Sequence, residues 1–214
     1  MSALVVSLRV VVPALFAVVP VGAALGYFLT RARGPVRAVV DALVLVPLVL
    51  PPSVVGYLLL LLLGRRGAIG ALLERAFDVR LVFSSAGASV AVAAVALPLM
   101  AKASEAAFSR VDRGLEEVAA ANGLSRGATF RIVTLPLALP GLAAATTLAA
   151  LRALGEFGAT LTFAGYTKAT ATAPLEVYFA MQQGDDARAL SLSLALVAIS
   201  TVAALLFHAW SRRA

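Results

Sequence analysis

Long apolar runs alternate with short charged stretches along most of the chain. Runs of about twenty or more mostly apolar residues cover residues 10–30, 38–63, 81–101, 132–151 and 189–210. A helix needs about 20 such residues to cross the hydrocarbon core of a bilayer. The pattern therefore predicts an all-α membrane protein, a polytopic bundle of about five transmembrane helices, with room for a sixth.

Three of the spans have features of their own. The second span carries Pro47, Pro51 and Pro52, and proline removes a backbone donor, so we expect a kink that is either a hinge or a packed bend. The third and fourth spans are rich in glycine and alanine, which lets membrane helices approach closely. Between the second and third spans, residues 64–80 have apolar positions at helical spacing among four arginines. They predict a short amphipathic helix at the membrane interface.

A polar segment at residues 116–136 interrupts the apolar pattern. Asp112 can cap a helix whose first turn holds Glu116 and Glu117, where the helix dipole favours negative charge. Gly123 suits the left-handed position that ends a helix, and Ser125 can cap a second one. These signals predict a pair of short helices at the membrane surface, suited to a partner's groove or simply forming a capped loop.

The composition agrees with a membrane location. Apolar residues make up 61% of the 214 residues and the mean hydropathy is +0.96, far above the roughly 45–50% apolar content of soluble domains. The net charge of +7 comes from residues that flank apolar runs, so it relates to orientation in the membrane and not to nucleic acid. Basic residues divide almost evenly between the two sides, which only weakly favours a cytoplasmic polar segment.

Motifs for chemistry are missing from the sequence. It has no G-x-x-x-x-G-K-[ST] loop for nucleotide phosphates, no G-x-S-x-G, no H-E-x-x-H and no cysteine. We therefore expect no enzyme activity and no cofactor in this chain, and energy from an ion gradient or another subunit. Arg152 and Glu156 lie four residues apart at the end of the fourth span and can form a pair. Such a pair either lies beside a transport path or only anchors the span. Residues 157–167 are uncharged but too short to span, as in a re-entrant or interfacial segment.

The sequence resembles the permease subunits of ABC importers. Glu117, Val118 and Ala119, then Gly123, then Val133 to Pro136 follow the pattern E-A-A-x3-G-x9-I-x-L-P of the cytoplasmic EAA loop in that family. The stretches RALGEFGATLTFAG from Arg152 and PLEVYFAMQQGD from Pro174 resemble the molybdate permease branch, whose near relatives are the sulfate and thiosulfate permeases. Tyr166 stands where that branch tends to have asparagine. The resemblance covers residues 105 to about 200.

The resemblance implies a single permease domain over residues 1–214, with a coupling loop at about 103–133. It implies a multi-pass protein of a bacterial or archaeal plasma membrane that imports molybdate or tungstate. Its partners would be an ATPase subunit on the coupling loop, an extracytoplasmic binding protein, a second permease copy and membrane lipid. The ATPase-coupling residues would be Glu116, Glu117, Ala119, Ala120, Gly123, Leu135 and Pro136. The residues of the translocation path or gate would be Arg152, Glu156, Phe157, Gly158 and Thr160.

Three other functions stay open at this point. The first is a permease for sulfate or thiosulfate. A secondary transporter is the second, although such proteins carry inverted repeats and carboxylates within the membrane, and neither is visible here. The third is a passive membrane scaffold.

Overall fold

The computed structural model describes residues 2–211, and the side chains of all of these except residues 208, 210 and 211. Within that part of the chain every regular element is helical. The helices are α1 (Ala3–Arg31), α2 (Gly34–Val49), α3 (Pro52–Leu63), α4 (Ala68–Phe77), α5 (Ser85–Ser109), α6 (Arg113–Ala121), α7 (Arg126–Thr129), the π-helix η1 (Phe130–Thr134), α8 (Leu135–Leu154), α9 (Gly158–Ala164), α10 (Ala173–Gln182) and α11 (Asp186–Ser211).

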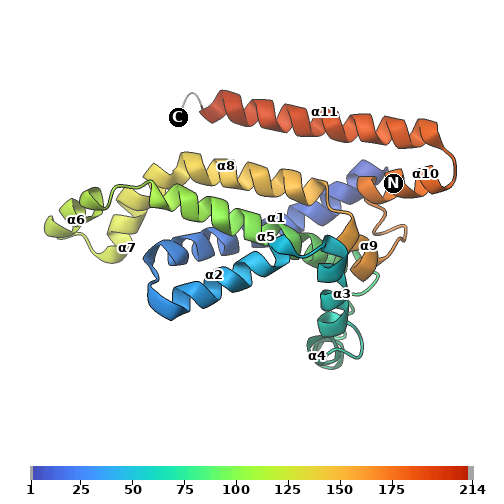
Figure 1. Cartoon of the computed structure of the whole chain (residues 1–214), viewed down its shortest axis with the longest axis horizontal. Helices are drawn as coiled ribbons and strands as arrows, with labels where there is room; N and C mark the ends of the chain where they lie inside the picture. The colour runs from blue at the N-terminus through green and yellow to red at the C-terminus, as the bar shows by residue number, and fades with distance from the viewer. Residues whose placement is uncertain (1, 212–214) are drawn as a thin grey trace.

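Five helical passes run along the long axis of the molecule. Helices α1, α2, α5, α8 and α11 run roughly along this axis (Figure 1). Four helices of residues 2–211 are long and apolar enough to cross a membrane, and the pair α2 and α3 gives a fifth if it counts as one span. The expected all-α bundle of about five spans is confirmed, and the described chain contains no candidate for a sixth.

The second span is broken and not merely kinked. Helix α2 ends at Val49, and α3 starts at Pro52 with its axis bent by 114° from that of α2. Leu50 and Pro51 between them have extended backbone angles. Two consecutive prolines lack the N–H groups that would continue the helical ladder, and proline disfavours the helical conformation of the residue before it. The prolines marked the right place, but the expected kink is a full break.

Small side chains hold α1, α5 and α8 together. A Cβ atom added to Gly26 in α1 would lie 2.6 Å from the Cβ atom of Ser104 in α5, and one added to Gly141 in α8 would lie 2.6 Å from that of Ala107. Ala145 and Ala149, four and eight residues after Gly141, are completely buried. The small-residue faces predicted for the third and fourth spans therefore form the packed centre of the bundle.

Two boundaries differ from the sequence expectation. Helix α5 continues through residues 103–109, where the predicted coupling loop was expected to begin, so the connection between α5 and α6 starts at Arg110. The second short helix is not separate, because α7, η1 and α8 form one helix from Arg126 to Leu154. Its π-helical turn ends at Thr134, two residues before Pro136, which has no N–H to donate. A local π turn lets the helix continue past a proline that would otherwise interrupt it.

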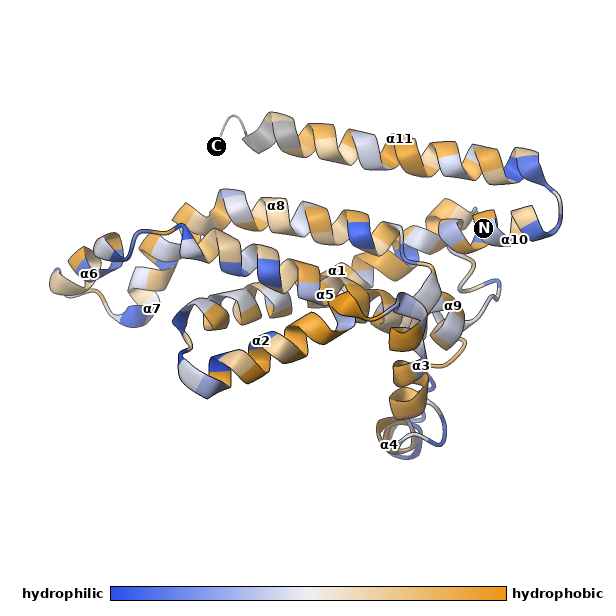
Figure 2. Cartoon of the chain, in the orientation of Figure 1, coloured by the Kyte–Doolittle hydropathy of each residue, from blue (hydrophilic) through white to orange (hydrophobic). Residues whose placement is uncertain are grey.

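Helix α3 projects to the side of the long axis and carries α4 at its tip, away from α6 (Figure 1). The predicted interfacial helix is present as α4, with exposed Ile69 and Leu72, and it stops at Asp78 in a left-handed conformation. The segment at residues 157–167 contains only the short helix α9, as its length required. Figure 2 shows that α11 is mainly hydrophobic along its length, whereas the α10–α11 connection and much of α6 are hydrophilic.

Candidate functional site

Local capping groups define the α6–α7 hairpin at one end of the bundle. Asp112 accepts a hydrogen bond from the backbone N–H of Gly114 at 2.8 Å, and Ser125 accepts one from that of Ala128 at 3.3 Å. Gly123 has φ of +85°, and the N–H of Leu124 donates to the carbonyl of Ala119, which closes the C-terminus of α6. All three capping residues act as the sequence predicted.

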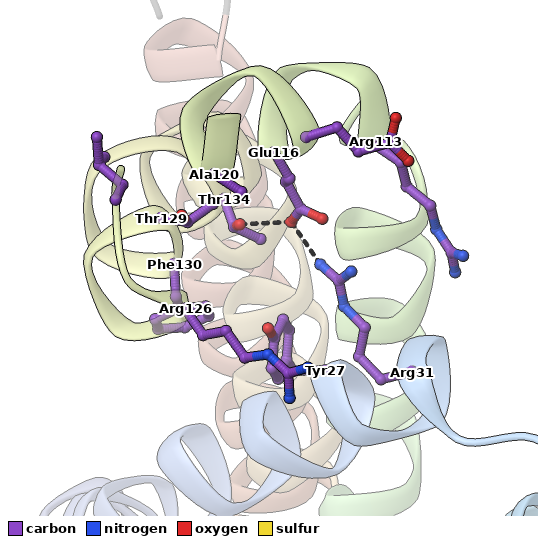
Figure 3. Close-up of a pocket in the computed structure, with 11 residues that line it drawn as sticks. Tyr27, Arg31, Arg113, Glu116, Ala120, Arg126, Thr129, Phe130 and Thr134 are labelled. Carbon is purple, nitrogen blue, oxygen red and sulfur yellow. Dashed lines mark hydrogen bonds and ion pairs between the residues drawn. The ribbon is translucent and has the colours of Figure 1, made fainter. Parts of the chain in front are cut away.

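Glu116 points back into the bundle and not toward the surface of α6. Its Oε1 atom accepts hydrogen bonds from the Arg31 guanidinium at the end of α1 and from the Thr134 hydroxyl at 2.5 Å (Figure 3). The Glu116 side chain is 12% exposed. Burial raises its pKa, but the bonds from Arg31 and Thr134 and the charges of Arg31 and Arg113 lower the pKa of Glu116 overall. Glu116 is therefore a charged attachment point between α6, α1 and η1.

A hollow of about 480 Å³ lies beneath α6, between the hairpin and the bundle. Arg31, Glu116, Ala120 and Thr134 line it (Figure 3). Its inner side is closed by an aromatic cluster in which the ring of Tyr27 lies 4.9 Å from that of Phe130 and 5.3 Å from that of Phe108. The hairpin therefore rests on the Glu116 attachment, on a hydrogen bond from Arg113 of α6 to the carbonyl of Thr30 at 3.1 Å, and on the aromatic contact, with open space between them.

The outer surface of α6 is apolar and unpaired within the chain. Leu115 and Val118 are exposed, although both are large hydrophobic residues. Glu117 and Ala120 are also exposed, but they lie on the side of α6 that borders the hollow, and Gly123 follows at the exposed end of the helix. An exposed apolar face on a short helix, bordered by a carboxylate, has the character of a docking surface.

The residues predicted for coupling thus divide into two groups. Glu117, Ala120, Gly123 and Pro136 are exposed, whereas Ala119 is buried and Glu116 and Leu135 are partly buried. Only the exposed group can touch another subunit in this conformation.

The second predicted group lies where α8 meets α9. An Arg152 Nη2 atom lies 2.7 Å from Glu156 Oε2, which confirms the predicted pair. The other carboxylate oxygen of Glu156 accepts the backbone N–H of Ala159 at 2.8 Å, at the start of α9. The Glu156 side chain is only 1% exposed, whereas Arg152 is 31% exposed. Arg152 is therefore the accessible charge of the pair, and Glu156 holds it in place.

The neighbours of this pair are closely packed. The Phe157 ring lies 5.1 Å from that of Tyr178 in α10, and a Cβ added to Gly158 would lie 3.1 Å from the backbone nitrogen of Ser53, next to the break between α2 and α3. Thr160 is completely buried, and its hydroxyl has no hydrogen-bond partner in the described structure. Thr160 is thus enclosed by its own chain in this conformation.

Sequence reasoning missed a charged network between α2 and α5. Lys102 donates to Asp41 at 2.8 Å and also to Glu105, and Arg37 donates to Glu105 at 3.1 Å. It also missed Arg31 and Thr134 as partners of Glu116. Lys102 and Glu105 are three residues apart on one helix, but the other partners are 18 to 85 residues apart in sequence, so charged residues near the ends of apolar runs were the only available signal for them.

Comparison with known proteins places this geometry in a family. Residues 19–214 match the family described as "Binding-protein-dependent transport system inner membrane component". The molybdenum transport system permease protein ModB of Escherichia coli is 40% identical over 99% of this chain and 93% of its own length. The sulfate transport system permease protein CysT of Salmonella typhimurium is 32% identical over 84% of this chain and 65% of its own length.

Solved structures agree on the fold. A structure of the MetNI methionine ABC transporter superposes with a TM-score of 0.76 at 19% identity, covering 97% of this chain and 92% of that chain. The family match covers most of the sequence, and the apolar helices agree with a multi-pass protein of the inner membrane. The chain therefore belongs to the binding-protein-dependent transport system inner membrane components, the permease subunits of ABC transporters.

Proposed function

We propose that this chain is the permease of an importer for molybdate or tungstate. The observation that carries the proposal is the 40% identity to a molybdenum permease over 99% of the chain, against 32% over 84% for a sulfate permease. Sulfate or thiosulfate is the second candidate, because that relative shares most of the sequence. Membership of a permease family disfavours the secondary transporter and the passive scaffold.

A separate ATPase subunit docks on the exposed face of α6. The sequence has no phosphate-binding loop, so hydrolysis of ATP takes place in that partner, and this chain needs no cofactor. Glu117, Ala120 and Gly123 form the contact together with exposed Leu115 and Val118. Pro136 lies at the base of the hairpin, with Leu135 beside it. This assignment puts the α6 end of the bundle in the cytoplasm.

The translocation path passes beside Arg152 at the far end of α8. A half-exposed guanidinium inside a membrane protein can attract an oxyanion, while its pairing with buried Glu156 limits how tightly it holds one. Phe157, Gly158 and Thr160 belong to the packed gate around it. A second copy of the chain completes the path, and an extracytoplasmic binding protein delivers the anion to the α4 end.

Uptake by reconstituted vesicles tests the substrate directly. The chain, its ATPase subunit and its binding protein are placed in vesicles, and ATP-dependent uptake of labelled molybdate, tungstate and sulfate is measured. Uptake of molybdate or tungstate with sulfate at background level is the expected result. Sulfate uptake without molybdate or tungstate uptake would refute the substrate, and failure to bind any ATPase subunit would refute the importer.

The Arg152→Gln variant tests the path in the same assay. It should lower uptake and leave ATPase binding unchanged, because the α6 end is untouched. Unaltered transport by this variant would leave the pair as a structural anchor only.

A further inference from the structure

A second hollow lies at the α6 end, on the side where α1 ends and α2 begins. Its volume is about 470 Å³, within the range of sites that hold small ligands. Arg31, Arg37 and Arg113 line it together with Phe108 and Val111. We call it the arginine hollow. The connection between α1 and α2 beside it is one of the most hydrophilic parts of the molecule (Figure 2).

The three lining arginines are fixed in place but keep free donors. An Arg113 Nη2 atom donates to the carbonyl of Thr30 at 3.1 Å, and Arg37 and Arg31 each use an Nη2 atom on a glutamate. A guanidinium has five N–H donors. Each arginine therefore holds its position through one group and can offer others to an anion.

Two further arginines are close in sequence to residues that line the arginine hollow. Arg33 is the residue before α2, and Arg110 lies between the lining residues Ser109 and Val111, although neither arginine lines the hollow itself. Both are exposed, and within residues 2–211 neither side chain forms a hydrogen bond or ion pair. Three arginines thus line the hollow and two more are near it in sequence, while its nearby acidic groups, Glu105, Asp112 and Glu116, are all engaged in bonds within the chain.

The position of the arginine hollow favours a lipid over a free ion. Helices α1 and α5 end here and α2 begins here, so the hollow lies at the level of phospholipid headgroups. Next to Arg37, exposed Val36, Val39 and Leu43 lie at helical spacing along α2. These side chains form an apolar strip that an acyl chain can contact. A free phosphate ion has no apolar part that could contact it. Basic pockets between helix ends are a recurring arrangement for anionic headgroups.

We propose that the arginine hollow binds the phosphate of an anionic phospholipid, with an acyl chain along α2. The bound lipid connects α2, which has no buried residue of its own, to α1 and the start of α6. The proposal requires only that this end of the bundle meets a membrane surface. It can therefore fail while the transport function stands, and the reverse is also true.

Native mass spectrometry of the purified chain in detergent tests this site. The chain is titrated with phosphatidylglycerol and with zwitterionic phosphatidylcholine, and the bound lipids are counted. An arginine near an anionic membrane surface strengthens binding about fivefold. The double variant Arg33→Gln with Arg110→Gln should therefore weaken phosphatidylglycerol binding by about 25-fold.

Matched controls separate this site from general charge effects. Arg66→Gln with Arg75→Gln removes two exposed arginines near α4, which also form no hydrogen bond or ion pair in the described chain, and should leave binding nearly unchanged. Arg33→Lys with Arg110→Lys should keep most of the binding. If the double glutamine variant is unstable, the single variants should each lose about fivefold.

Several results would overturn the proposal. They are equal binding of the two lipids, an equal loss in the α4 control, and displacement of the lipid by inorganic phosphate or molybdate. Loss of the lipid when the ATPase subunit docks would also overturn it, because the arginine hollow would then belong to the subunit interface.

Discussion

Glu116 should transmit force between α6 and the bundle, whereas its neighbour Glu117 should only bind the partner. Glu116→Gln keeps the size of the side chain and one acceptor but removes the charge that receives two hydrogen bonds from Arg31 and Thr134. Hydrogen bonds to a charged group contribute about 1.5–3 kcal/mol and are roughly twice as strong as neutral ones. The Arg31 side chain is 38% exposed, so water weakens the contribution of its bond to Glu116.

Glu116→Gln therefore lowers the free energy that holds α6 on the bundle by about 1–2 kcal/mol. This raises the fraction of molecules with α6 detached about 5- to 30-fold. A nitroxide label reports this directly, because the chain has no cysteine and Ala121→Cys supplies a unique exposed site on α6. Glu116→Gln should increase the mobile part of the label's spectrum. It should also increase the ATP hydrolysed per molybdate transported while the affinity for the ATPase subunit stays the same.

Glu117→Gln is the matched control one residue away. It should weaken ATPase binding and leave the label as immobile as in the unchanged chain, because Glu117 is exposed. Identical behaviour of the two variants would refute the division of roles. An immobile label in Glu116→Gln would refute the attachment itself.

Three other predictions follow from the same contacts. Gly26→Ala should lower stability by about 1–3 kcal/mol through overpacking between α1 and α5, seen as a lower Tm in detergent. Gly127→Ala is the control and should not lower the Tm, because no atom lies within 4 Å of its Cβ position. Gly123→Val should lower stability by about 1–2 kcal/mol through left-handed backbone strain alone, because the space around Gly123 is empty. It should also raise the ATP used per molybdate more than Gly123→Asn does. Because the folded-state pKa of Glu116 is lowered, its attachment is complete above the usual carboxyl pKa of about 4.3 and is lost as pH falls through the lowered value. The Ala121→Cys label should therefore be insensitive to pH from about 8 to 5, become mobile in stronger acid, and lose this acid-dependent step in Glu116→Gln.

Sequence signals located features whose causes are local. Asp112, Ser125 and Gly123 act on backbone groups within a few residues of themselves, so their spacing alone predicts both ends of α6. Arg152 and Glu156 are one helical turn apart, and their pairing is predictable for the same reason. Paired prolines marked the break between α2 and α3, but the 114° bend depends on what the two helices pack against.

Contacts between distant segments were beyond such reasoning. Arg31 and Glu116 are separated by 85 residues, and nothing in either neighbourhood specifies the other. The family pattern grouped Glu116 with Glu117 as docking residues, yet Glu116 is bonded to Arg31 and Thr134, whereas Glu117 is exposed. A helix turns by about 100° per residue, so adjacent side chains point in different directions. Only the position of α1 decides which of the two points inward.

One helix joins both parts of the candidate site. Residues 126–154 form a 29-residue helix, about 43 Å long, which spans a bilayer core in one piece. Near one end, Thr134 holds Glu116 of α6, and near the other Arg152 pairs with Glu156 at the start of α9. The apolar body between them is packed through Gly141, Ala145 and Ala149 and has no break. A displacement of α6 can therefore reach the proposed path without a chain of separate contacts. Its one irregular turn, at Phe130–Thr134, lies next to the Glu116 attachment. Flexing there would decouple α6 from the path, and so the attachment and the π turn must act together.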